Sequence, residues 1–567
     1  MAAGEVVQGR EARLPPGPWD VVVVGAGIYG LPTAFFLARQ LRARVLVLED
    51  NAIPGECITV NTGGIIRIAY SDLDVVRVAA FAREIYRDPT TRLGLRASVH
   101  LGFVPTGWGR FVSESAIPGI LAEVGRIAAG AGGRLDVVSM REYLERLSPG
   151  RRRNLERIMD VDDSTHVLVD EEGGFADGGT ALTGFLEACL EAGVCVSLYS
   201  HVVEFLREGE RVTGLVLERW SQQGGDRQVV ARETVRADRI VLAAGRGNAA
   251  LVRAAAGWEM PTFTSFHQVP YIRNSADNDF AQRRYTVGPP GAHREVELID
   301  APTISHWRDI YFRPEGSGMI FGTHHRELQP DDYQPRGGEI GGLRVGLDQV
   351  MIDTLLEVMP HFPVLSSQGL NLGKTPADIA GGAYYMNPEE LPIEGEVPGT
   401  DGRVFYAGSG CGTGFKLGPG VSWLLAQRMS GIAREDRLIA SPALSAERAE
   451  YFYPPGTSRE ELLRQFRPAS EGGRLIEMGA AGIAVGPPRP SRPSPRGSPS
   501  GSPTPISIPC PSPFRRGPGS AASTPSAWRW RVSRHHRCTR PRVPSPPRAA
   551  TASGAGADRP ISRAHAS

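Results

Sequence analysis

A run of glycines follows four consecutive valines near the start of the chain, in the segment Asp20-Val-Val-Val-Val-Gly25-Ala26-Gly27-Ile28-Tyr29-Gly30. Four consecutive valines predict a strand that is buried on both faces. Gly25 permits a tight turn, Gly27 lets the backbone approach a pyrophosphate, and Gly30 lets the following helix pack on the strand. This spacing predicts a site for the phosphates of a dinucleotide.

The residues after the glycines complete that unit. A helix expected over 31–41 would direct its N-terminal amides at the phosphates. A second strand is expected over 45–48, and the acids Glu49 and Asp50 follow it. A carboxylate about 20 residues after the glycines is placed to accept hydrogen bonds from the ribose of an adenosine. Because NAD and FAD both use this unit, the motif alone leaves the nucleotide open.

A second glycine cluster lies late in the chain, from Gly408 to Gly414, and is expected to lead into a helix at about Pro419. Proline is favoured in the first turn of a helix. A helix N-terminus stabilises negative charge that develops in front of it. Lys416 lies two residues after this cluster and, with Lys374, is one of two lysines among 63 basic residues.

The elements that must position these clusters are predicted from periodicity. We expect a helix within 171–192, strands over 194–216, and a buried strand over 239–245. Residues 258–345 alternate like an antiparallel sheet, with adjacent strands at 311–313 and 319–322. A parallel strand is expected over 404–408 and a helix over 421–429. The charged stretch 151–170 is expected to be peripheral.

Taken in order, these segments resemble the D-amino-acid oxidase superfamily of FAD enzymes, in particular its glycine oxidase and sarcosine oxidase branch. The likeness covers residues 19–430. It is carried by the first glycine run and by Asn61–Tyr70, Glu172–Asp177, Ser200–Val202, Ala237–Gly245, Tyr311–Gly316, Asn387–Gly395, Val404–Gly408 and Gly414–Gly420. The resemblance implies an α/β fold. It consists of a Rossmann-like FAD-binding domain with a three-layer ββα arrangement and an inserted antiparallel-sheet substrate domain.

The resemblance also implies which residues form the site. Arg67 and Lys416 would bind a substrate carboxylate, as two cations aimed at one cavity favour an anionic ligand. His324 would shape the pocket or accept a proton, unless it is simply a polar residue at a strand end, and His267 has a weaker claim. The residues expected to contact FAD are Gly25, Ala26, Gly27, Ile28, Tyr29, Gly30, Glu49, Asp50, Thr62, Gly63, Gly64, Val202, Ala244, Gly245, Gly382, Gly408, Gly412, Thr413, Gly414, Phe415 and Lys416.

Four positions depart from the pattern of sarcosine-oxidising relatives. Gly382 stands where they carry the cysteine that attaches the flavin, so FAD is expected to be non-covalent, with Cys411 a remote alternative. Ile320 stands where they carry a lysine that promotes reaction with oxygen. Gly64 replaces a further arginine, and Gly410–Gly412 contains an extra residue.

The implied reaction is oxidation of the C–N bond of a small amine or amino acid, with hydride transfer to flavin N5 and hydrolysis of the imine. Oxygen or another compound would be the electron acceptor. Three alternatives stay open: a tailoring enzyme that acts on a larger biosynthetic amine, a nicotinamide dehydrogenase, and a non-catalytic FAD-binding subunit.

Charge and composition exclude other classes. The chain has 567 residues and a net charge of +1, but residues 489–567 hold fourteen arginines and one acid, so residues 1–488 carry about −12. An acidic body is a poor nucleic-acid binder. No apolar run reaches the roughly 20 residues of a membrane span. The six cysteines form no zinc-like cluster, which favours reduced thiols in the cytoplasm and no bound metal.

Composition and motif order also predict domain boundaries. We expect a flexible N-terminus (1–18), an FAD-binding domain in three parts (19–100, 161–257 and 371–435), a mixed cap segment (101–160), an antiparallel substrate domain (258–370), a helical segment (436–467) and a disordered tail rich in Pro, Arg and Ser (468–567). The tail has too few apolar residues to offset the entropy of folding.

Overall fold

The computed structural model describes residues 4–7, 14–70, 72–96, 98–112, 118–223, 226–260, 262–273, 279–288, 293–306, 310–323, 327–329, 349–367, 379–387, 391–433 and 444–446. All of them lie in one unit, Met1–Arg489. His324 and the predicted tail lie outside the described residues. Among the described residues, no helix combines the length and the apolar character that a membrane span requires.

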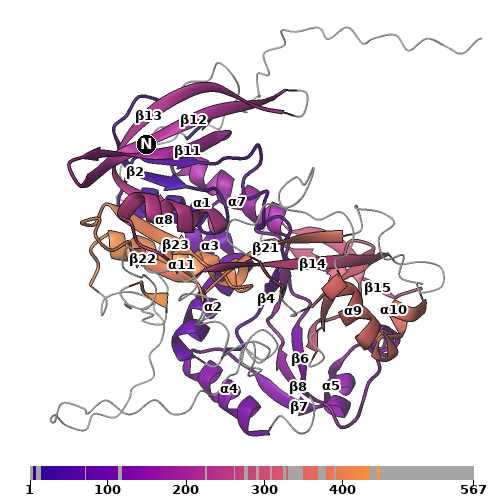
Figure 1. Ribbon diagram of the computed structural model, residues 1–567. Helices are drawn as coiled ribbons and strands as arrows, with labels where there is room; N and C mark the ends of the chain where they lie inside the picture. Colours follow the sequence, from indigo (N-terminus) through magenta and orange to yellow (C-terminus); the bar gives the residue numbers. More distant parts are fainter. Residues whose placement is uncertain are drawn as a thin grey trace, which may run out of the picture. The chain divides into compact units, whose positions relative to one another are not determined.

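The first sheet is the nucleotide-binding layer, and its parallel strands run in the order β1-β10-β3-β2-β13, with β23 beside β13. β12 and β11 extend β13 as an antiparallel meander, and β22 pairs antiparallel with β23. The strands are β1 (Val6–Val7), β2 (Trp19–Val24), β3 (Val45–Leu48), β10 (Cys195–Ser197), β11 (Ser200–Glu208), β12 (Arg211–Gln223), β13 (Asp226–Leu242), β22 (Ile393–Glu396) and β23 (Val404–Gly408). Figure 1 shows the meander above the parallel strands and the helices below them.

The valine run of β2 is buried on both faces, as its sequence predicts. Val21 and Val23 belong to a core shared with the helices. Val22 and Val24 belong to a second core, shared with the meander. Alternate side chains of a strand point to opposite faces, so a run of apolar residues can serve two layers at once. The three-layer ββα arrangement follows from this division.

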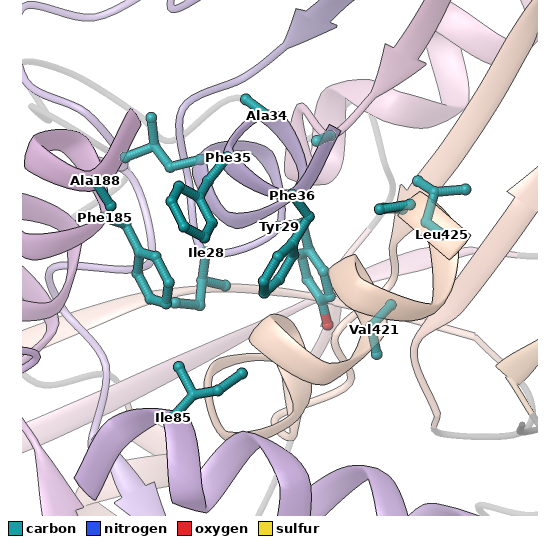
Figure 2. Packing of buried hydrophobic residues seen from close by; sticks show 14 of the residues in the cluster. Ile28, Tyr29, Ala34, Phe35, Phe36, Ile85, Phe185, Ala188, Val421 and Leu425 are labelled. Atoms are coloured by element: carbon teal, nitrogen blue, oxygen red, sulfur yellow. The ribbon is translucent and has the colours of Figure 1, made fainter. Parts of the chain in front are cut away.

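Four helices pack on the helical side of this sheet: α1 (Gly30–Gln40), α2 (Leu73–Arg87), α7 (Gly178–Glu191) and α11 (Gly414–Met429). Figure 2 shows Phe36 of α1 and Leu425 of α11 in this core, together with Phe185 of α7. The other α-helices in the described residues are α3 (Pro89–Leu93), α4 (Pro118–Gly130), α5 (Met140–Arg146), α6 (Pro149–Ile158), α8 (Asn248–Ala256), α9 (Gln349–Val358) and α10 (Pro363–Ser367). The apolar spacing predicted for 171–192 therefore marks a real core helix.

The second large sheet is mostly antiparallel, as expected, in the order β20-β14-β19-β18-β17-β6-β8-β7, with β21 beside β14. Its strands β17 and β6 pair in parallel. Its strands are β6 (Trp108–Val112), β7 (Asp136–Ser139), β8 (His166–Asp170), β14 (Phe263–Arg273), β17 (Thr303–His306), β18 (Ile310–Glu315), β19 (Gly318–Thr323), β20 (Glu327–Gln329) and β21 (Ile379–Met386). The predicted pairing of 311–313 with 319–322 is confirmed, since Phe312 pairs with Phe321.

Two small sheets complete the fold. One joins β4 (Ile65–Ile66), β9 (Gly174–Ala176) and β5 (Phe103–Val104). The other is the hairpin of β15 (Gln282–Val287) and β16 (Arg294–Ile299).

Three boundaries differ from the sequence prediction. Val6 and Val7 form a strand inside the segment expected to be flexible, because they extend the parallel sheet beside β10. The stretch 151–170 was expected at the periphery, yet it ends in β8, a strand between β6 and β7. Its last residue, Asp170, is fully buried. Helix α11 begins at Gly414, earlier than the expected Pro419, which lies inside the helix.

Candidate functional site

The first glycine turn is fixed by close backbone approaches. Gly25 has φ +103°, and a Cβ built on it would lie 2.4 Å from the carbonyl oxygen of Ala243. A Cβ on Gly30 would lie 1.8 Å from the carbonyl oxygen of Gly25. These two glycines are therefore required by the fold itself. Gly27 differs, because a Cβ there would meet only the Thr59 hydroxyl, at 3.3 Å. The open space beside Gly27 is what a pyrophosphate needs.

Glu49 joins the end of β3 to that turn. Its side chain accepts hydrogen bonds from the Ala26 amide (2.8 Å) and from the backbone amide of Asn51 (3.0 Å). Burial raises the pKa of Glu49, while these amide bonds act to lower it. The carboxylate thus lies beside the glycine turn, where the sequence predicts an adenosine ribose.

Asp50, the next acid, faces a different set of partners. It accepts from the Trp220 indole (3.0 Å) and the Arg227 guanidinium (2.7 Å), and it lies 3.1 Å from His201 Nδ1. Arg227 also stacks over the Trp220 ring, 4.6 Å from its centroid. Burial would raise the pKa of Asp50, but His201 and Arg227 outweigh it and lower that pKa. The Asp50 carboxylate is therefore already bound by side chains of strands β11, β12 and β13, and Glu49 is the better candidate to bind the ribose.

The first turn and the late glycine cluster meet, although almost 400 residues separate them. Ser422 of α11 donates a hydrogen bond to the carbonyl oxygen of Tyr29 (3.0 Å). A Cβ on Gly414 would lie 2.8 Å from the Tyr29 hydroxyl, and one on Gly418 would lie 2.9 Å from the Ile28 carbonyl oxygen. Figure 2 shows the Tyr29 ring directed at α11. Glycine is required on both sides of this contact because the backbones approach so closely.

The Tyr29 hydroxyl is an unpaired polar group at this junction. It is buried and has no hydrogen-bond partner among the described residues. Burial raises its pKa well above the usual value for tyrosine. An unpaired buried hydroxyl costs about 1–3 kcal/mol, so a polar ligand in this region would relieve that cost. This orphaned hydroxyl and the open side of Gly27 both fit a cofactor that spans the two glycine turns.

The late glycine loop is held in an unusual conformation. Ser409, Cys411 and Gly412 all have positive φ, at +52°, +49° and +71°. Non-glycine residues in this region carry strain, which is concentrated at functional sites in proteins. The loop ends at Thr413, which makes no side-chain cap to α11. The first amides of α11 are thus left for another acceptor, and the helix dipole favours a negative one.

Lys416 lies in the first turn of α11, and its ammonium group donates to the carbonyl oxygen of Gly412 (3.2 Å). The dipole of a helix disfavours a cation in its first turn. An anion close to Lys416 would offset this cost. Phe415 anchors the same turn from behind, since its carbonyl oxygen accepts a hydrogen bond from the buried Tyr86 hydroxyl (2.7 Å).

Arg67 directly follows β4, a strand that contacts α11. Its guanidinium lies 4.5 Å from the ring centroid of Tyr70 and 5.2 Å from that of Trp108, and it donates to the carbonyl oxygen of Ala69. Burial raises the pKa of Tyr70 to about 12, although Arg67 acts to lower it. In the described part of the chain no carboxylate pairs with Arg67.

The loop before Arg67 is shaped by close contacts. Thr62 accepts from the Gly64 amide (3.2 Å). Gly64 has φ +64°, and a Cβ there would lie 2.1 Å from the Ala176 carbonyl oxygen. Glycine at position 64 is therefore a requirement of the pairing between β4 and β9, and no longer side chain fits. Gly63 lies against Tyr311, whose ring is 3.2 Å from the Cβ position of Gly63.

Tyr311 and Tyr384 are site candidates that sequence reasoning missed as individual residues. Their side chains are hydrogen-bonded, and burial raises the pKa of Tyr311 well above its usual value. Tyr384 stacks on His267, with ring centroids 3.9 Å apart, and lies 3.1 Å from the Cβ position of Gly412. The tyrosine pair thus links the loop at Gly63 to the loop at Gly412. The sequence predicted only the pairing of 311–313 with 319–322. It gave no signal that β18 and β21, which are distant in sequence, bring these two rings together.

The remaining predicted residues lie around the same two sheets. Val202 is the third residue of β11, whose first residue, Ser200, donates its amide to the carbonyl oxygen of Glu49 (2.8 Å). Ala244 donates its amide to Asn248 (2.7 Å). Gly408 contacts the same asparagine, with 2.7 Å between its Cβ position and Asn248 Nδ2. Asn248 is fully buried and was also missed.

Two glycines and an isoleucine complete the predicted set. Gly245 has φ +57° with no atom near its Cβ position. Gly382 of β21 pairs with His267, and its Cβ position is 3.5 Å from the Cys57 carbonyl oxygen. Ile320 is buried beside Tyr311 and Val269. Within the described residues, no three His, Cys, Asp or Glu side chains gather as a metal site would require.

The comparisons with known proteins agree with this geometry. The model of the family described as "FAD dependent oxidoreductase" matches residues 20–428. The chain therefore belongs to this family of FAD-dependent oxidoreductases. The match begins in β2, directly before the first glycine turn, and ends within α11, the helix that contacts this turn at Tyr29.

Individual relatives are distant. The chain is 24% identical to human mitochondrial sarcosine dehydrogenase over 428 residues, which cover 74% of this chain and 40% of the relative. It is 24% identical over 253 residues to the sarcosine oxidase subunit beta of Arthrobacter sp, covering 44% of this chain and 56% of the relative. The chain thus spans well under two thirds of the length of these relatives.

Two solved structures share the fold. L-proline dehydrogenase from P. horikoshii aligns with a TM-score of 0.57 at 18% identity, over 75% of this chain and 96% of the other. Glycine oxidase from Bacillus cereus aligns with a TM-score of 0.52 at 16% identity, over 75% of this chain and 99% of the other. The predicted fold class, a Rossmann-like FAD-binding domain with an antiparallel second sheet, is confirmed.

Proposed function

We propose that this protein is an FAD-dependent enzyme that oxidises the C–N bond of a small amine or amino acid bearing a carboxylate. The observation that carries the proposal is Arg67. It is a half-buried cation, enclosed by Tyr70 and Trp108, without a carboxylate partner among the described residues. A desolvated cation is costly unless an anion reaches it, and a planar guanidinium binds a carboxylate through two parallel hydrogen bonds.

Two groups of residues would bind the two ends of FAD. The amides after Gly27 and the Glu49 carboxylate would hold the pyrophosphate and the adenosine ribose. The uncapped N-terminus of α11 and the Tyr29 hydroxyl would face the flavin end. The attachment would be non-covalent, because Gly382 offers no nucleophile and the Cys411 thiol is buried within hydrogen-bond range of the Ser409 carbonyl oxygen. When bound, FAD would supply the two-electron acceptor for the C–N oxidation.

The protein's contribution to the reaction is orientation and charge. Arg67 and Lys416 would hold the substrate carboxylate, which fixes the position of the carbon that is oxidised. The hydrogen-bonded pair of Tyr311 and Tyr384, with its apolar neighbour Ile320, would form the opposite wall and exclude water. No protein acid or base is required, since the amine would give its proton to water before it reacts.

The proposal leaves two candidates for the electron acceptor that re-oxidises the flavin. Ile320 stands at the position where the resemblance to sarcosine-oxidising enzymes implies a lysine that promotes reaction with oxygen, and its side chain carries no charge. We therefore include both oxygen and a separate acceptor in the proposal. We also propose the domain division given above, and a cytoplasmic location, since the four described cysteines are free thiols,.

The test is an anaerobic screen of the purified, FAD-loaded protein against a panel of amines and amino acids. The panel contains glycine, sarcosine, proline, both enantiomers of larger amino acids, and matched amines without a carboxylate. We expect the visible flavin absorbance to bleach with at least one carboxylate-bearing member and not with its matched amine. Exposure to air then reports whether oxygen re-oxidises the flavin. A flavin that no member bleaches would contradict catalysis and favour an FAD-binding subunit.

A further inference from the structure

Among the described residues, Arg67 is held by aromatic rings and a backbone carbonyl and not by a counter-ion. Its guanidinium contacts two aromatic rings and donates to the carbonyl oxygen of Ala69. Its direction therefore depends on the backbone that follows it and on the place of the Trp108 ring. A charged group serves as a binding residue only when its orientation is fixed in advance.

One buried acid, Asp170, lies next to both the backbone that follows Arg67 and the residue Trp108. The Asp170 carboxylate accepts a hydrogen bond from the Ile68 amide (3.1 Å), the peptide next to Arg67. Asp170 is also the register partner of Trp108 across strands β6 and β8. Its side chain has no solvent exposure. This single residue thus fixes the backbone beside Arg67 and neighbours the residue whose ring packs against it.

Asp170 is itself held from helix α2. The Arg83 guanidinium lies 2.9 Å from Asp170, and its side chain is 4% exposed. Arg83 also contacts Glu172 at 2.6 Å, but the side chain of Glu172 is 48% exposed. The buried acid and the exposed acid therefore share one arginine, while only the buried acid contacts the backbone beside Arg67.

We propose that Asp170, fixed by Arg83, is the positioning residue that orients Arg67 toward the carboxylate of the substrate. This inference rests on the proposed function, because it assigns a purpose to the same cation. It goes further in naming a layer behind the binding site, built from β8 and α2, that sets the affinity for the carboxylate. Asp170 does not touch the substrate and acts only through Arg67.

The test compares Asp170→Asn with Glu172→Gln in the FAD-loaded protein. Each variant removes one negative charge from the surroundings of Arg83, but only the first disturbs the Ile68 contact. Benzoate serves as the carboxylate probe and benzamide as its neutral isostere, with binding read from the perturbation of the flavin spectrum. Neither probe requires turnover, so the readout is independent of the amine screen.

We expect Asp170→Asn to weaken benzoate binding by about ten-fold to a hundred-fold, as a displaced binding group does. Benzamide binding and FAD content should stay within about two-fold of the wild type, because neither depends on the charge of Arg67. Glu172→Gln should leave all three unchanged. With any substrate found in the screen, Asp170→Asn should raise KM far more than it lowers kcat.

Three results would overturn the inference. One is a variant Asp170→Asn that binds benzoate like the wild type. Another is a parallel loss of benzoate and benzamide, which indicates general collapse of the site. The third is equal weakening by Glu172→Gln. If Asp170→Asn does not fold, Asp170→Glu carries the test, because it keeps the charge beside Arg83 but displaces the contact to Ile68.

The control Arg67→Met separates this inference from the proposed function. If the wild type binds benzoate and Arg67→Met does not, Arg67 is the carboxylate ligand and the result for Asp170 decides the inference alone. If Arg67→Met binds benzoate as tightly as the wild type, the carboxylate role of Arg67 in the proposed function is wrong, and the positioning role of Asp170 is wrong with it.

Discussion

Two aspartates of this protein are each paired with an arginine, at opposite ends of the proposed site. Asp170 lies beside Arg67, and neither it nor Arg83 is appreciably exposed, at 0% and 4%. Asp50 lies beside Glu49 and also has several partners, but its side chain is 40% exposed and that of Arg227 is 41% exposed. Exposed ion pairs contribute about 0–1 kcal/mol, whereas breaking a buried pair costs about 3–5 kcal/mol. Burial, and not the number of contacts, therefore separates the two.

The largest expected effect is on stability, from Asp170→Ala. This change leaves the Arg83 charge buried and the Ile68 amide without its acceptor. We expect the free energy of unfolding to fall by about 3–5 kcal/mol, measured by urea denaturation of the protein without FAD. Glu172→Ala is the matched control, since it removes the exposed partner of the same arginine. A loss below about 1 kcal/mol for Asp170→Ala would show that burial does not distinguish the two acids.

The next effect is on substrate binding, from Arg67→Met. Methionine keeps part of the apolar contact with Tyr70 and Trp108 but loses the charge. A hydrogen bond to a charged group contributes about 1.5–3 kcal/mol, so KM for a carboxylate substrate should rise by about ten-fold to a hundred-fold. FAD affinity should not change. Steady-state kinetics with excess FAD measures the first quantity, and a parallel loss of FAD would contradict the separation of the two ends.

The opposite pattern is expected from Glu49→Gln at the adenosine end. Glutamine keeps one oxygen for the Ala26 amide but cannot accept through two oxygens from both that amide and Asn51. We expect FAD affinity to fall by about ten-fold, with KM unchanged at saturating FAD. Fluorescence titration of the apoprotein with FAD measures the affinity. Unchanged affinity would mean that Glu49 only supports the turn.

The smallest effect is the pH dependence of the Asp50 cluster. The pKa of Asp50 is lowered in the fold, so its contribution to stability is present above its unfolded pKa and is lost as the pH falls through the folded value,. Asp50→Asn should therefore destabilise the protein by about 1 kcal/mol or less at neutral pH. The difference from the wild type should shrink with acidification below about pH 4. A difference that grows in acid would contradict the sign of this pKa change.

The same two regions show what the sequence could predict. The unit from β2 to Glu49 was predictable because its signals are local: a valine run, three glycines at fixed spacing, and an acid after the second strand. The confirmed fold class followed from the order of such local motifs. The late loop was located correctly, but its helix begins at Gly414 because Pro419 is tolerated inside it.

The supports behind Arg67 were not predictable for a physical reason. The stretch that ends at Asp170 is charged, and charge favours a surface position unless a partner is buried with it. The partner, Arg83, lies 87 residues earlier in the chain. The pairing of Tyr311 with Tyr384 is likewise a contact between strands that periodicity cannot place together. Both features depend on tertiary contacts and not on local pattern.

The central claim is that one FAD lies along the first glycine turn and reaches the late one. Gly27→Val tests it directly, because a Cβ atom at Gly27 meets only the Thr59 hydroxyl in the protein and the side chain would occupy the space for the pyrophosphate. Equilibrium titration with FAD should show one FAD bound per chain in the wild type. It should show none in Gly27→Val, with the melting temperature of the two apoproteins unchanged. Equal FAD binding by both proteins, or no binding by the wild type, would contradict the account.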